Sequence, residues 1–200
     1  MPNDMTATPA RERILETAAE LFYRDGYGAV GVDTIIARAA VAKTTLYRHF
    51  PSKDDLIVAY LERADERFCT WFEHAIAEHQ EPRAKLAGVF EAVASLAASP
   101  ACLGCTFQGA ASEFPSQEHP GHRVARQHKQ AVLDRLEELA RDGGAEDPAR
   151  LAGELLLVMD GAFAAARMFG RRSPAAAAPQ AAAALLDAQL PARSPRRHAR

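Results

Sequence analysis

The sequence predicts an all-α protein, and two observations carry this prediction. Apolar residues recur at alternating steps of three and four along most of the chain, which is the spacing of amphipathic helices. Proline, glycine and capping residues separate these stretches, and no stretch alternates apolar and polar residues as a half-buried strand does. With 48% hydrophobic residues among 200, the chain is long and apolar enough to bury a core.

The first three predicted helices are closely spaced. Thr8 and Pro9 mark the start of a helix of about four turns, which Gly26 ends. Residues 32–40 repeat the helical pattern in miniature, and a tight connection leads into a second short helix over 43–50. Two short helices joined by a tight turn describe a helix-turn-helix, whose second helix can place its N-terminal side chains in the major groove of DNA.

The remaining helices predict a larger helical body. Ser52 followed by Asp55 resembles a capping box, and a long helix then runs from Leu56 to about His79. The helix that begins at Pro148 is apolar nearly all round, so it must be buried on several sides. Longer helices are expected at residues 82–98, 119–142, 148–169 and 180–190, and a shorter helix is expected to end before Pro115.

These helices divide into two expected domains and a tail. We expect a helix-turn-helix domain over residues 8–68, with the helix-turn-helix itself at about 31–50. A larger helical domain is expected over 69–190. Residues 191–200 are basic and broken by proline, so we expect a disordered tail there.

Composition and charge limit the classes of function. The formal charge of −2 and the pI near 6.4 argue against bulk coating of nucleic acid, so any such contact must be local. Three cysteines and an N-terminus without an apolar core predict a cytoplasmic protein with no disulfide framework. The most apolar segment, 155–169, is broken by Asp160 and Arg167, so no membrane span is expected. Because no nucleophile and base pairing, metal cluster or phosphate loop is visible, we expect no enzyme, cofactor or metal site.

A local cluster of cations occupies the helix-turn-helix. Four of them lie there: Arg38, Lys43, Arg48 and Lys53. No carboxylate lies between Asp33 and Asp54. Such a run is most often a solvated helix face, but it is also the pattern of a surface that binds phosphates.

The residue types along the second short helix suit DNA contact. Lys43 can bond base edges or phosphate, and Thr44 and Thr45 offer a hydroxyl for phosphate and a methyl group for thymine. Three further side chains can reach the flanking DNA backbone: Tyr47, His49 and Lys53. Lys53 also lies in the first turn of the next helix, where exposed N–H groups and the positive end of the dipole attract phosphate.

The order of residues adds a family resemblance. From Ile14 the chain reads ILETAAELFYRDGY, and from Ile35 it reads IIARAAVAKTTLYRHFPSKDDL. Over roughly residues 8–68 this strongly resembles the tetracycline-repressor (TetR) family of bacterial transcriptional regulators. The resemblance implies phosphate or base contacts at Lys43, Thr45, Tyr47, His49 and Lys53, and it adds Thr34 and Arg48 to the candidate contacts.

Two residues depart from the family pattern. Ala40 occupies a turn position where the family usually has glycine, and Ala42 occupies a cap position where it usually has serine. Losing the cap hydroxyl costs about 1 kcal/mol of local helix stability, and it removes one candidate phosphate contact. We expect DNA binding to survive both changes.

The resemblance also implies a homodimer and a small effector. The apolar helix at 148–169 and the alanine-rich helix at 180–190 are expected to form the dimer, which requires a palindromic operator in double-stranded DNA. We expect a repressor that a small hydrophobic effector releases. The residues expected around the effector are mostly aromatic, with three polar groups for orientation: Trp71, Phe72, Phe90, Phe107, Glu113, His128, Asp160, Phe163 and Met168.

Other interpretations stay open for two groups of residues. Cys102 and Cys105 have the spacing of a redox motif, so a small helical thiol-dependent redox enzyme is the alternative function. Buried cysteines are the commoner use of such residues, redox sensing is a further alternative, and a zinc site with His119 and His122 is the least favoured. Asp160, within an apolar helix, is either a paired core carboxylate or a ligand contact.

Overall fold

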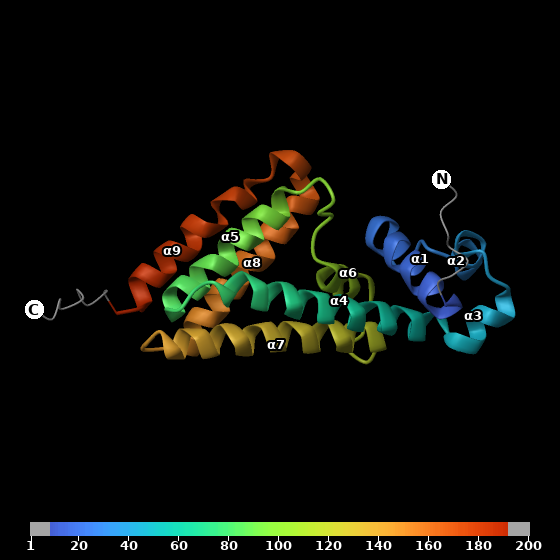
Figure 1. Cartoon of the computed structure of the whole chain (residues 1–200), viewed down its shortest axis with the longest axis horizontal. Helices are drawn as coiled ribbons and strands as arrows, with labels where there is room; N and C mark the ends of the chain where they lie inside the picture. Colours follow the sequence, from blue (N-terminus) through green and yellow to red (C-terminus); the bar gives the residue numbers. More distant parts are fainter. Residues whose placement is uncertain (1–8, 192–200) are drawn as a thin grey trace, which may run out of the picture. The chain divides into compact units, whose positions relative to one another are not determined.

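The computed structural model describes residues 9–191, and every regular element within that range is helical (Figure 1). The α-helices of that range are α1 Ala10–Asp25, α2 Val32–Ala39, α3 Lys43–His49, α4 Lys53–Ala77, α5 Pro82–Ala98, α6 Thr106–Glu113, α7 Pro120–Asp142, α8 Pro148–Phe169 and α9 Ala178–Gln189. Two 3-10 turns, η1 Gly170–Arg172 and η2 Pro174–Ala177, separate α8 from α9. The predicted all-α class is confirmed.

The predicted helix boundaries agree closely with those observed. Helices α5 and α8 span the predicted residues, whereas α4 begins at Lys53 rather than at Leu56. The earlier start follows from the cap, because Ser52 Oγ accepts a hydrogen bond from Asp55 N at 3.1 Å and donates to Asp55 Oδ2 at 2.7 Å. The predicted capping residue Thr8 and the predicted tail from residue 192 onward lie outside the described residues.

The chain forms two compact units. The first comprises the described residues up to Cys69 together with Cys105–Lys129, and the second comprises Thr70–Gly104 with the described residues from Gln130 onward. Helices α4 and α7 therefore contribute to both units. The first unit contains the predicted helix-turn-helix and, beyond it, α6 and the first part of α7.

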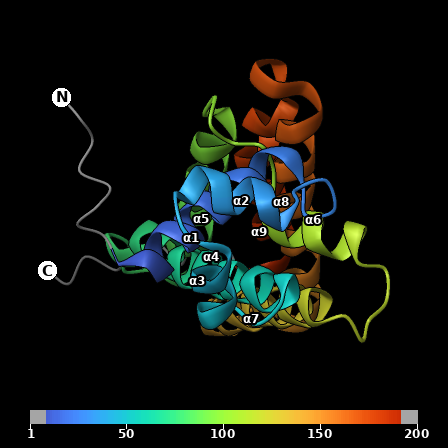
Figure 2. The same cartoon turned by 90° about the vertical axis from the view of Figure 1, so that its right-hand side faces the viewer.

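The first unit has a continuous apolar core beneath its N-terminal helices. Helices α1, α2 and α3 pack on one another (Figure 2) and bury Ile14, Phe22, Ile35 and Leu46, each at most 2% exposed. Full burial of such side chains stabilises by about 1.5–3 kcal/mol each. Because Ile35 of α2 and Leu46 of α3 both enter this core, it fixes how the two helices of the helix-turn-helix lie against each other.

Helix α6 is hydrogen-bonded to this core at both of its ends. At its first residue, Thr106 Oγ1 lies 2.7 Å from both Tyr27 Oη and Tyr60 Oη, and Tyr27 Oη also donates to Thr106 O at 3.0 Å. At its last residue, the Glu113 carboxylate accepts hydrogen bonds from Tyr27 N at 3.1 Å and Gly28 N at 2.6 Å. The loop that follows α1 is therefore held by both ends of α6.

Glycine is required where α1 ends. Gly26 has φ 88° and ψ 165°, a conformation that is strained for any residue with a Cβ. A Cβ at this position would also lie 2.7 Å from Glu113 Oε1, inside the contact distance of the carboxylate that holds the loop. The predicted stop at Gly26 thus has two physical causes, one from the backbone and one from packing.

The second unit is built around α5, α8 and α9, which lie side by side (Figure 1). Helix α8 buries one face, including Leu151, Leu155 and Met159, each at most 1% exposed. Its opposite face carries Leu157 and Met168, which are 74% and 76% exposed. The sequence predicted burial of α8 on several sides, and in the single chain this second face contacts water. No helix within residues 9–191 is long and apolar enough to span a membrane.

Candidate nucleic-acid interface

The turn between α2 and α3 contains no glycine. Ala40 takes the left-handed conformation, with φ 50° and ψ 52°, and its N–H bonds back to Ala37 O and Ile36 O. Within residues 9–191 it is the single non-glycine residue with positive φ. Because a Cβ is disfavoured in this region, alanine costs about 1 kcal/mol here relative to glycine. The core formed by Ile35 and Leu46 outweighs that cost, so the turn forms despite the unusual residue.

Helix α3 begins without a side-chain cap. Ala42 is its N-cap residue and makes no side-chain hydrogen bond, while its carbonyl accepts from Thr45 N at 2.9 Å and Leu46 N at 3.2 Å. The sequence predicted the absence of this cap, and a missing cap hydroxyl costs about 1 kcal/mol. A helix of 7 residues is not stable alone, so α3 depends on Leu46, which is fully buried beneath it.

The residues predicted to contact DNA all lie on α2, α3 and the first residue of α4, and none of them is buried. The exposed ones are Thr34, Lys43, Thr44, Tyr47 and Arg48. The half-buried ones are Thr45, His49 and Lys53. Helix α3 thus exposes hydroxyl, phenol and basic groups to solvent and buries Leu46 in the core.

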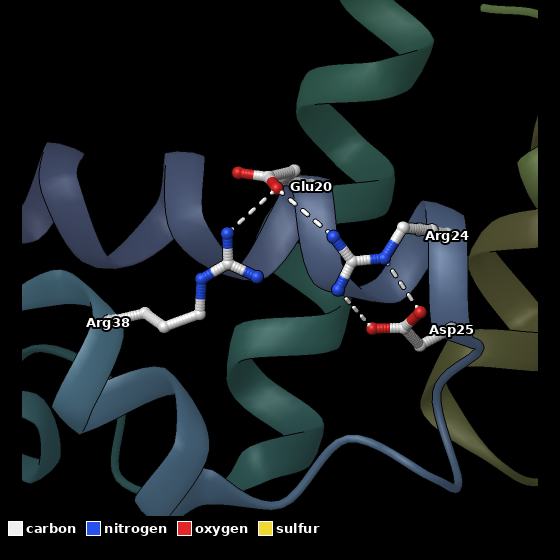
Figure 3. Close-up of polar contacts among 4 residues, drawn as sticks. All are labelled: Glu20, Arg24, Asp25 and Arg38. Carbon is white, nitrogen blue, oxygen red and sulfur yellow. Dashed lines mark hydrogen bonds and ion pairs between the residues drawn. The ribbon is translucent and has the colours of Figure 1, made fainter.

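One cation of the predicted cluster is engaged within the protein. Arg38 of α2 pairs with Glu20 of α1 at 3.0 Å, and Glu20 also lies 3.4 Å from Arg24 (Figure 3). Arg24 in turn forms two hydrogen bonds with the Asp25 carboxylate, which keep the pKa of that carboxyl below its usual range. Arg38 therefore helps to hold α2 against α1.

Lys43 also has a partner, which the sequence did not predict. Its Nζ lies 3.3 Å from Asp33 Oδ1, across the turn from α3 to α2. Both side chains face water, with 63% of Lys43 and 85% of Asp33 exposed. The one sequence signal that could have revealed the pair is that Asp33 is the single acidic residue between Gly26 and Lys53.

The first turn of α4 supplies the other candidate phosphate contact. Lys53 is the first residue of α4, where unpaired N–H groups and the positive end of the helix dipole favour an anion. The two carboxylates that follow it have partners of their own. Asp55 bonds with Ser52, and Asp54 Oδ1 lies 3.6 Å from His119 Nε2. Lys53 is therefore a candidate phosphate contact that lies beside two carboxylates.

The residues predicted to contact an effector divide between the two units. Phe107, Glu113 and His128 belong to the first unit, and Trp71, Phe72, Phe90, Asp160, Phe163 and Met168 belong to the second. In the first unit the Phe107 ring stacks on His128 with centroids 3.5 Å apart, and His128 Nδ1 lies 2.6 Å from Asp65 Oδ1. Glu113 binds the backbone N–H groups of the loop after α1.

In the second unit the same candidates differ in exposure. Phe72, Phe90 and Phe163 are buried, Trp71 and Asp160 are half-buried, and Met168 faces water. None of the three cysteines forms a disulfide: Cys69 is exposed, Cys102 is buried, and Cys105 is the half-buried N-cap residue of α6.

The arrangement at the N-terminus defines a class of protein. Two short helices joined by a tight turn, packed on a third helix and exposing cations, hydroxyls and a phenol, form a helix-turn-helix DNA-binding module.

Comparison with known proteins assigns the family. The model of the bacterial regulatory proteins of the tetR family matches residues 14–60. A TetR-family transcriptional regulator from Streptomyces coelicolor is 34% identical, and its structure matches with a TM-score of 0.86, covering 90% of this chain and 95% of that one. A TetR transcriptional regulator from Chloroflexus aurantiacus is 26% identical, with a TM-score of 0.81 and coverage of 90% and 96%. The HTH-type transcriptional regulator YjdC of Escherichia coli is 27% identical, over 82% of this chain and 86% of that protein.

The chain belongs to the TetR family, and it is a DNA-binding transcriptional regulator. The relatives are regulators of transcription, so the alternative of a thiol-dependent redox enzyme built on Cys102 and Cys105 gains no support.

Proposed function

We propose that this regulator is a cytoplasmic repressor that binds a palindromic operator as a homodimer and is released by a small hydrophobic effector. The observation that carries the proposal is the exposed face of α3 with the start of α4. Four polar side chains lie there within a dozen residues of one another: Lys43, Thr44, Tyr47 and Lys53. The buried Leu46 packs α3 against the core. In this proposal α3 enters the major groove, and Lys53 binds a flanking phosphate.

The exposed apolar face of α8 supports the homodimer. Leu157, Gly161, Ala164 and Met168 follow one another at steps of four, three and four, and all are exposed in the single chain. On α9 the residues Ala181, Ala184 and Ala188 are also exposed. Small side chains let helices approach closely, so a second copy can cover both faces. A two-fold dimer then presents two α3 helices to two half-sites about one helical turn apart.

Replacement of Lys53 tests the DNA contacts directly. Because Lys53 contacts phosphate in this proposal, Lys53→Ala is expected to weaken binding to all duplexes and to lower the salt slope by about one unit. Fluorescence anisotropy with a selected and a scrambled duplex at several salt concentrations measures both quantities. Lys85→Ala, which removes a lysine of the second unit, is the matched control. If both Tyr47→Ala and Lys53→Ala leave binding and its salt dependence unchanged, the assignment of the interface is wrong.

The effector is proposed to be hydrophobic and aromatic. The candidate residues of the second unit are mostly aromatic, and three of them, Phe72, Phe90 and Phe163, are buried. In the first unit, His128 offers a polar group whose ring stacks on Phe107. We expect an effector present at 100 times its Kd to stabilise the protein by about 2.7 kcal/mol. An effector can change operator affinity only by as much as its own affinities differ between the state that binds the operator and the state that does not. Thermal-shift screening of aromatic compounds, followed by measurement of operator release, tests this. Absence of both effects across the screen would refute the proposal.

A further inference from the structure

Asp33 places a carboxylate on the face that is proposed to contact DNA. Asp33 is the single acidic residue between Gly26 and Lys53, and its side chain is 85% exposed beside the exposed Thr34. A carboxylate near a duplex is repelled by the phosphates and loses its hydration, so it weakens binding unless it has another task. As a residue of the first turn of α2 it also interacts favourably with the helix dipole, which is the simplest alternative explanation.

The contact with Lys43 suggests a second role for Asp33, which is to restrain the Lys43 side chain. Lys43 is the first residue of α3, where the positive end of the helix dipole disfavours a cation. Asp33 Oδ1, 3.3 Å from Nζ, offsets this and draws the ammonium toward the N-terminus of α2. A lysine without this partner is a flexible point charge that can follow any phosphate. Held by Asp33, its ammonium has fewer orientations and must give up a partner before it binds a phosphate.

We propose that Asp33 is a positioning residue that restrains Lys43, so that this lysine contributes to recognition of the operator rather than to uniform binding of phosphate. The inference rests on the proposed DNA contact of α3. The inference predicts a lower affinity for DNA in general and a greater discrimination between sequences. The Asp33–Lys43 ion pair opposes contact of Lys43 with a non-operator duplex. At the operator, contacts between Lys43 and the bases replace the ion pair. Since the pair is exposed, the size of the effect is expected to be about two- to fivefold.

The test begins with duplexes that the wild-type protein enriches from a random-sequence pool. Affinities for one enriched and one scrambled duplex are then measured against salt concentration for the wild type, Asp33→Asn, Lys43→Met and the double variant. Asp33→Asn is expected to tighten binding to the scrambled duplex about two- to fivefold more than to the enriched one, and to steepen the salt slope on the scrambled duplex by about one unit. In the Lys43→Met background the same substitution should not steepen the slope.

Matched variants separate this role from charge and stability. Asp25→Asn also removes a carboxylate that is paired with a cation, Arg24, outside the predicted contacts, so the ratio of the two affinities should stay at the wild-type value. Asp33→Glu keeps the charge and should restore part of the discrimination, while thermal unfolding reports any loss of helix α2. Equal tightening of both duplexes by Asp33→Asn, with or without Lys43, would show general repulsion only and would overturn the inference. If the wild type enriches no sequence at all, it is the proposed operator binding that fails.

Discussion

The Gly161→Arg variant is expected to be a folded monomer whose affinity for the operator is lower by about 100- to 10,000-fold. In the proposed dimer both half-sites are bound together, and the loss of one half removes the effective concentration that joins them. Gly161 lies in the exposed stripe of α8 between Leu157 and Met168, and a Cβ at this position would meet no atom within 4 Å. Arginine there would bring an unpaired charge into a tightly packed contact between copies, which strongly disfavours association.

Because Gly161 is exposed in the single chain, the folded chain is expected to tolerate this change. Arginine is a better helix former than glycine by about 0.8 kcal/mol, so Gly161→Arg should not lower the stability of α8 itself. Sedimentation measures the mass of the particle, and anisotropy measures operator affinity. Ala131→Arg, which adds the same charge at an exposed alanine of α7, is expected to change neither. A Gly161→Arg protein that sediments as a dimer with wild-type affinity would place the interface elsewhere.

The helices of this protein were largely predictable because their ends are set by local chemistry. Pro82 and Pro148 begin α5 and α8, and Gly26 ends α1. The role of α6 could not be predicted in this way. Its first and last residues bind Tyr27, which is 79 residues from Thr106 and 86 from Glu113 in the sequence, and no periodicity signals such distant partners.

The exposure of the candidate DNA-contacting side chains was predictable for the same local reason. The order of residues from Ile35 to Leu56 places Leu46 inward and Lys43, Thr44 and Tyr47 outward on one short helix. Pairings between side chains were not predictable. Glu113 was expected to orient an effector, and the structure shows its carboxylate bound to two backbone N–H groups. Which polar groups meet depends on tertiary packing, so the effector residues remain a prediction.

The buried hydroxyl cluster at the start of α6 carries the second large expected effect. Tyr27 and Tyr60 are 2% and 7% exposed, and both phenols meet at Thr106 Oγ1. One arrangement of protons satisfies all three hydroxyls: Tyr60 donates to Thr106 Oγ1, Thr106 donates to Tyr27 Oη, and Tyr27 donates to Thr106 O. Burial raises the pKa of both tyrosines above the ordinary value of 10.0, so both phenols stay protonated at neutral pH and can donate.

Thr106→Val removes the shared hydroxyl while nearly preserving the shape of the side chain. Tyr27 keeps the Thr106 carbonyl as a partner, but the buried Tyr60 hydroxyl loses the acceptor at 2.7 Å, so unfolding by denaturant should show a loss of about 1–3 kcal/mol. Thr106→Ser keeps the hydroxyl and should lose less than this. Because the cost comes from an unpaired phenol, Thr106→Val should cost clearly less in a Tyr60→Phe background, where that phenol is absent. Additive losses in this double-mutant cycle would contradict the shared hydrogen bond.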